Sequence, residues 1–118
     1  MKRVFLIFPA MLCLAAPAQA TTGLVCSTGE LPIHLSMTIG HTAVPAVVSA
    51  RLIDNRREVP VIIAQSWLDP NGVRVDLIDR NGMRHEARLR ATWRAATRSY
   101  DGSLWRNGKH RWIRCREG

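Results

Sequence analysis

Apolar and polar residues alternate with a period of two along most of this chain, which is the pattern of half-buried β-strands. The clearest run is 83–93, where Met83, His85, Ala87, Leu89, Ala91 and Trp93 share one face. The same alternation between Leu31 and Ile39 predicts a second apolar face. We expect strands near residues 23–28, 31–39, 45–53, 58–68, 72–79, 83–93, 97–106 and 109–116. A helix over 87–99 is the one helical alternative, since this segment is rich in Ala and Arg.

Tight turns separate these runs. Asn-Gly occurs three times, at Asn71-Gly72, Asn81-Gly82 and Asn107-Gly108. Between alternating runs it is a strong hairpin signal, because both turn residues must take a positive φ. About eight short strands joined in this way predict an all-β antiparallel meander. We expect it to form a closed or partly closed barrel, with a two-sheet sandwich as the alternative.

The segment 58–68 differs from the others because it is almost continuously apolar. Such a run is typical of a strand covered on both faces. Pro60 would lie near the start of this strand, where the loss of an amide donor matters least.

The first twenty residues have the features of a secretory signal peptide. Lys2 and Arg3 precede an apolar run over 4–16, and Ala18-Gln19-Ala20 is a small-x-small cleavage site. We expect cleavage after Ala20, which leaves 21–118 as a single domain in the periplasm or outside the cell. An uncleaved N-terminal anchor is the alternative. Removal of 1–20 lowers the formal charge of +8 by two, and the cations that remain are Arg apart from Lys109.

Two of the three cysteines, Cys26 and Cys115, lie outside this leader. In an oxidising compartment a disulfide is the default for such a pair. A closed meander brings its first and last strands together, so the same bond would join the terminal strands.

Sequence signals for catalysis are weak. His34, His41, His85 and His110 have no zinc-site spacing, and no phosphate loop or nucleophile elbow occurs. Asp76 with Asp79, or Glu86 with Asp101, has nothing in its spacing to favour paired catalytic carboxylates over surface acids. His85 lies on the apolar face of its strand, which favours a core histidine over a ligand. We expect a non-enzymatic protein with no cofactor and no metal.

Two features suggest binding. A row of cations on one strand face and its neighbour could bind phosphates or carboxylates, although it could also be a solvated outer face. Its members are Arg74, Arg84, Arg88, Arg90 and Arg94, with Glu86 interrupting the row. The C-terminal hairpin is the second feature, because an exposed Trp among Arg residues suits a protein partner or a sugar or base. Its candidate partner-binding residues are Trp105, His110, Trp112 and Arg114, of which the last three point outward if Ile113 and Cys115 point inward; a Trp covering a barrel end is the alternative.

The two ends of the domain resemble the periplasmic C-type lysozyme inhibitor family. The matching parts are Gly23-Leu24-Val25-Cys26 and Ser103-Leu104-Trp105-Arg106-Asn107-Gly108 running to Cys115. The resemblance implies a small secreted β-barrel with a terminal disulfide that binds and inhibits a protein. The family's inhibitory-loop motif, Ser-x-Ser-Gly-x-x-Tyr, is not found: 95–100 reads Ala-Ala-Thr-Arg-Ser-Tyr.

Two functional hypotheses follow. The first is a secreted, inhibitor-like binding module that engages a protein partner through its C-terminal hairpin. The alternative is an envelope module that binds an anionic polymer, either lipopolysaccharide, peptidoglycan or nucleic acid, through the arginine row. Nucleic acid is the least favoured of these polymers.

Overall fold

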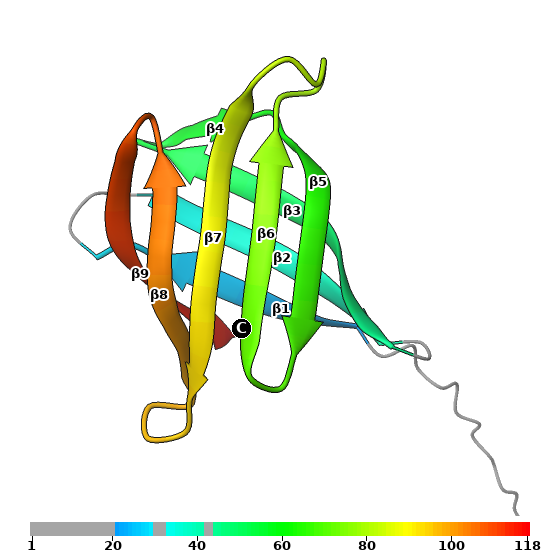
Figure 1. The fold of residues 1–118 in the computed structure, drawn as a ribbon, viewed down its shortest axis with the longest axis vertical. Coiled ribbons are helices and arrows are strands. Elements are labelled where there is room, and N and C mark those ends of the chain that lie inside the picture. Colours follow the sequence, from blue (N-terminus) through cyan, green and yellow to red (C-terminus); the bar gives the residue numbers. More distant parts are fainter. Residues whose placement is uncertain (1–20, 30–32, 42–43) are drawn as a thin grey trace, which may run out of the picture.

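A computed structural model describes residues 21–29, 33–41 and 44–118 (Figure 1). Every regular element in these ranges is a β-strand, so the helical alternative for 87–99 is wrong. The predicted signal peptide and Leu31 lie outside the described residues. The strands are β1 (Thr21–Ser27), β2 (Ile33–His41), β3 (Pro45–Asp54), β4 (Arg57–Val59), β5 (Ile62–Asp69), β6 (Gly72–Ile78), β7 (His85–Arg94), β8 (Ser99–Arg106) and β9 (Lys109–Glu117).

The strands form one antiparallel sheet in the order β4-β3-β2-β1-β9-β8-β7-β6-β5. Apart from β4 and β5, strands that follow each other in sequence are paired, and β1 also pairs with β9. The meander is therefore open only between β4 and β5, which confirms the partly closed barrel. Cys26 and Cys115 are directly opposite each other in the β1–β9 register and form the predicted disulfide. In the chain-entropy model, a bond across so long a loop stabilises the fold by roughly 4–5 kcal/mol.

The sheet curls into two crossing layers. In Figure 1, strands β5 to β8 run across the front of β1, β2 and β3. One apolar core fills the space between them. Its fully buried members include Leu35, Leu52, Val73, Leu77, Leu89, Leu104 and Ile113. The outward faces of β5 to β9 are thereby left for polar and aromatic side chains.

The segment 58–68 is not one strand covered on both faces, as the sequence suggested. It divides at Pro60 and Val61 into β4 and β5, which lie at the two opposite edges of the sheet. Proline has no amide hydrogen to donate to a neighbouring strand, so the strand ends there and the chain crosses to the other edge of the sheet. Most of β5 is exposed, and Trp67 keeps 59% of its surface accessible.

Only one of the three Asn-Gly pairs forms the expected turn with two positive φ angles. Asn107 and Gly108 have φ values of 53° and 77° and connect β8 to β9. At the Asn71-Gly72 pair, Gly72 already belongs to β6, and the Asp69 carboxylate caps the turn by accepting the Asn71 and Gly72 amides. At the Asn81-Gly82 pair only Gly82 has a positive φ.

The alternation along 83–93 changes phase at a β-bulge. Leu77 pairs with Ala87 and Ile78 with His85, so Glu86 has no opposite partner. An extra residue in one strand reverses the direction of the side chains before it. Consequently His85 is exposed rather than on the core face, and Glu86 is buried rather than on the basic face. Met83 lies in the loop before β7 and is also exposed. Trp93, at the other end of β7, is also 40% exposed.

Candidate functional site

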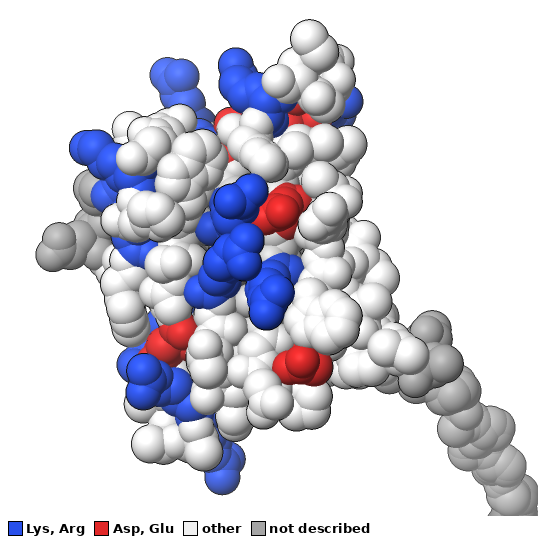
Figure 2. All heavy atoms as spheres, in the orientation of Figure 1, with Lys and Arg blue, Asp and Glu red and all other residues white. Residues whose placement is uncertain are grey.

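The outer surface of β5 to β9 brings the two groups of candidate residues together. In the sheet register, Arg74 is opposite Arg90, and Arg90 is opposite Ser103. One row along, Arg88 is opposite Trp105, which is opposite His110. We call this surface the arginine–tryptophan face, and its members are Trp67, Arg74, Arg88, Arg90, Trp105 and Trp112. Figure 2 shows cations gathered at its centre, over β6 and β7, with acidic atoms beside them.

Arg74 and Arg90 are the most informative pair on this face. Both side chains are exposed, and neither forms a hydrogen bond or ion pair with any other residue that the structure describes. Like charges directly opposite each other destabilise an antiparallel pair. Arg74 has only a longer-range attraction to Asp69, so both guanidinium groups remain available to an external anion.

Arg88 has a partner and borders a hollow. Its Nε donates to Oδ1 of Asp76 at 3.0 Å, with 41% of the arginine side chain exposed. A hollow of about 320 Å³ opens beside it, lined by His85, Arg88, Arg90, Ser103, Trp105 and His110. All its polar side chains can donate hydrogen bonds, and no carboxylate lines it, so the hollow suits an anionic group.

Exposed indole rings lie at both sides of the arginines. Trp67 lies on β5, opposite Arg74 of β6, and Trp112 lies on β9, opposite Ser103 of β8. Their exposed fractions are 59% and 53%. The Trp67 Nε1 group donates to Oδ2 of Asp69 at 2.9 Å, which restricts the ring. The predicted outward direction of Trp112 thus agrees with the structure, and the face offers flat apolar surfaces beside its cations.

Arg114 supports Trp112 and is itself bound to an acid. Its guanidinium carbon lies 5.1 Å from the centre of the Trp112 ring. Its Nε and Nη2 groups donate to the two carboxylate oxygens of Asp101, each at 2.8 Å. The hydrogen bonds from Arg114, together with one from Ser99, outweigh burial and lower the pKa of Asp101 to about 2. Arg114 therefore holds Trp112 in place and has little capacity left for a partner.

The two ends of the predicted arginine row lie apart from its centre. Arg84 precedes the bulge, and its Nη2 donates to Oε2 of Glu86 at 3.0 Å. Arg94 lies at the far end of β7, with its Nε 4.0 Å from Oδ2 of Asp101. The structure thus gathers Arg74, Arg88 and Arg90 and gives both end residues an acidic neighbour.

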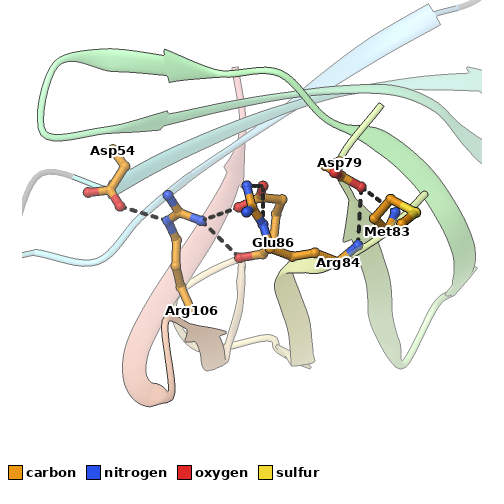
Figure 3. A network of polar contacts seen from close by, with 6 residues as sticks. All are labelled: Asp54, Asp79, Met83, Arg84, Glu86 and Arg106. Carbon is orange, nitrogen blue, oxygen red and sulfur yellow. Dashed lines mark hydrogen bonds and ion pairs between the residues drawn. The ribbon is translucent and has the colours of Figure 1, made fainter. Parts of the chain in front are cut away.

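Arg106 forms a separate polar cluster that is structural. Its side chain is 9% exposed, and its Nε donates to Oδ2 of Asp54 at 2.6 Å. Its Nη1 donates to the main-chain carbonyl and to Oε1 of Glu86, each at 3.0 Å (Figure 3). Burial alone would raise the pKa of Glu86. The hydrogen bonds from Arg84 and Arg106 outweigh burial, so this pKa lies below its usual value. The cluster ties β3 of one layer to β7 and β8 of the other.

The remaining acids serve local structure. Oδ1 of Asp79 accepts the amides of Met83 and Arg84 at 2.7 and 3.2 Å and closes the loop before β7 (Figure 3). Asp76 binds Arg88, as described above. Within the described ranges, no group of three or more potential metal ligands comes together.

Sequence reasoning missed three residues of the site. Trp67 lies on a segment that was expected to be buried, and the break at Pro60 was the signal that could have revealed an edge strand. Ser103 reaches the hollow only because β8 pairs with β7. His85 was placed in the core, and the bulge puts it at the rim of the hollow.

Comparison with known proteins leaves the site to be interpreted from its geometry. No family model matches this chain, and neither a curated protein nor a solved structure does. Among the described residues, no helix is long and apolar enough to cross a membrane.

Proposed function

We propose that this protein is a non-enzymatic binding module of the periplasm or cell exterior that holds an anionic glycan of the envelope. The glycan would carry phosphate or carboxylate groups, as lipopolysaccharide and peptidoglycan do. The unpaired Arg74 and Arg90, directly opposite each other on an exposed surface, carry this proposal. The signal-like leader and the Cys26–Cys115 disulfide support the location.

The chemistry of the face suits such a polymer. Guanidinium groups bind phosphate and carboxylate with two parallel hydrogen bonds. Exposed indole rings offer flat apolar surfaces on which the C–H faces of sugar rings can pack. Strands lie about 4.8 Å apart, so the row from Trp67 on β5 to Trp112 on β9 spans roughly 19 Å. A chain of several sugars can therefore contact both indoles and the arginines between them.

The experiment measures binding of deacylated lipopolysaccharide to Arg74→Glu/Arg90→Glu. We expect affinity to fall at least ten-fold at low salt, because two attractive cations become repulsive. Arg56→Glu/Arg57→Glu is the matched control, since it makes the same charge change at exposed positions near the β3–β4 turn. Equal losses in both variants would show only an effect of net charge and would refute the proposal. Competition by single-stranded DNA with equal strength would reassign the face to nucleic acid.

One observation favours a second candidate, an inhibitor-like module that binds a protein through the β8–β9 hairpin. Trp112 is exposed and held by Arg114, which is itself fixed by Asp101. Pre-positioned Trp residues are frequent hot spots of protein interfaces. Trp112→Ala should then abolish binding to a C-type lysozyme, the class of partner that the family resemblance implies. Such binding should depend little on salt, whereas glycan binding should fall steeply.

A further inference from the structure

A cavity of about 560 Å³ opens at one end of the half-barrel, away from the arginine–tryptophan face. It lies where the ends of β1 and β2 meet the β5–β6 turn and the β7–β8 hairpin. Its lining residues are Thr22, Leu24, Ile39, His41, Leu68, Pro70, Trp93, Arg98, Tyr100, Cys115, Arg116 and Glu117. Its size is in the range of small-molecule sites, and the mouths of β-barrels are frequent places for them.

The inner wall of this cavity is apolar. Leu24 and Ile39 belong to the buried core, with exposed fractions of 4% and 2%, and Leu68 packs against the same core. Trp93 and Tyr100 form an edge-to-face pair with ring centres 5.0 Å apart. Burial, with further contributions from Asp69 and Glu117, raises the pKa of Tyr100, which favours its neutral hydroxyl. The wall can therefore take a hydrocarbon chain.

The rim of the cavity carries both cations and an acid. Arg98 and Arg116 are both exposed, and neither forms an ion pair with any residue in the described ranges. Glu117 is the one acid in the lining. The Tyr100 hydroxyl has no hydrogen-bond partner among the described residues and could donate to a ligand. Asp69 and Glu117 both act on Tyr100, so the place for an anionic headgroup is at the two arginines and not at this hydroxyl.

Arg98 also occupies an unfavourable backbone position. It ends the β7–β8 turn with a φ of 54°, in the left-handed region that Gly or Asn adopts more easily. Glycine would fit this backbone with less strain.

We propose that this cavity binds a single-chain amphiphile with an anionic headgroup, such as a fatty acid. The hydrocarbon chain lies against Leu68, Trp93 and Tyr100, and the headgroup binds at Arg98 and Arg116. This site is separate from the glycan face and does not depend on the function proposed for that face.

The first test measures the affinity of hexanoate, octanoate and decanoate, each below its micellar concentration, by calorimetry. Burying one methylene favours binding by a factor of up to about four, so affinity should rise about two- to four-fold per methylene. Decyltrimethylammonium, which has the same chain length as decanoate and the opposite charge, should bind at least ten-fold more weakly. Affinity that does not change with chain length, or equal binding of the cation, would overturn the proposal.

The second test uses a variant that cannot fail through misfolding. Arg98→Gly removes the guanidinium group and relieves the backbone, so decanoate affinity should fall several-fold while the melting temperature stays equal or rises. Arg56→Gly is the matched control, because Arg56 also has a positive φ, 70°, and lies outside the cavity. Equal decanoate affinity of the two variants would contradict the assignment of Arg98.

A third arm separates this site from the glycan face. Arg74→Glu/Arg90→Glu should bind decanoate like the unaltered protein even though it loses the glycan. Loss of decanoate binding in this variant, with its fold intact, would mean that the amphiphile binds at the face instead of the cavity.

Discussion

Arginines occur in two opposite situations in this protein. Arg106 is buried, and its guanidinium group binds the carboxylates of Asp54 and Glu86 and a main-chain carbonyl. Arg74 and Arg90 are exposed, lie opposite each other, and form no hydrogen bond or ion pair with a carboxylate within the described ranges, although Arg74 has a longer-range attraction to Asp69. The three arginines lie on three consecutive strands of the same sheet: Arg74 on β6, Arg90 on β7 and Arg106 on β8.

The two situations distinguish arginines that stabilise the fold from arginines that do not. A buried cation must be paired, so the acids near Arg106 are explained by stability alone. An exposed pair of like charges is explained by neither stability nor burial. Burial and carboxylate partners therefore distinguish structural arginines from candidate ligand-binding arginines. Composition alone shows only that the chain is basic.

The largest effect on stability is expected for Arg106→Met. Removing Arg106 takes the hydrogen-bonded cation from Asp54 and leaves Glu86 with Arg84 alone, and breaking a buried ion pair typically costs about 3–5 kcal/mol. Urea unfolding followed by tryptophan fluorescence measures the change. The control is Arg74→Met, which should change the free energy of unfolding by no more than about 1 kcal/mol, because it only relieves the repulsion from Arg90. Similar losses in both variants would remove the distinction between the two kinds of arginine.

An intermediate effect is expected for Asp101→Asn, because it weakens the two hydrogen bonds from Arg114. Hydrogen bonds to charged groups contribute about 1.5–3 kcal/mol. The pKa of Asp101 is about 2 in the folded protein and 3.8 without the fold. Its contribution is therefore present above pH 4 and is lost as the pH falls from about 4 to 2. Unfolding curves between pH 2 and 7 should show this loss in the unaltered protein and a smaller one in the variant. Parallel pH profiles would contradict the role of Asp101.

The smallest effect is expected for Arg90→Gln, and its sign is the informative part. Relief of the repulsion from Arg74 should stabilise the fold by about 0.2–1 kcal/mol at low salt. The same variant should bind deacylated lipopolysaccharide more weakly. Thermal unfolding at 10 and 500 mM salt measures the first effect, and high salt should reduce it. A destabilised variant would mean that Arg90 belongs to the fold.

Much of the fold could be predicted from the sequence because its signals are local. Alternation along Ile33–Ile39 indicated the buried face of β2, and the positions of Cys26 and Cys115 indicated the closing strands. The corner at Pro60 and the bulge at Glu86 were missed. The apolar run 58–68 does not show that its two halves belong to strands at opposite edges of the sheet. A β-bulge depends on the pairing with the neighbouring strand, which the sequence of one strand does not specify.

The candidate site could be predicted only in parts. Arg88 and Arg90 were identified from β7, and Trp105 and His110 from the C-terminal hairpin, as members of two different surfaces. The register of β7 with β8, and of β8 with β9, makes them one surface around a hollow. Register depends on long-range pairing across the sheet, which no local pattern specifies.

The salt dependence of glycan binding shows whether Arg74 and Arg90 bind the anionic groups of the glycan. Deacylated lipopolysaccharide is titrated into the unaltered protein and into Arg74→Gln/Arg90→Gln at several salt concentrations. In nucleic-acid complexes each phosphate contact contributes about 0.7–0.9 to the slope of log affinity against log salt. If each arginine binds one phosphate of the glycan, the slope in the double variant should be smaller by about 1.4–1.8, and Arg56→Gln/Arg57→Gln should leave it unchanged. An unchanged slope in the double variant would contradict the claim that this pair binds the anion.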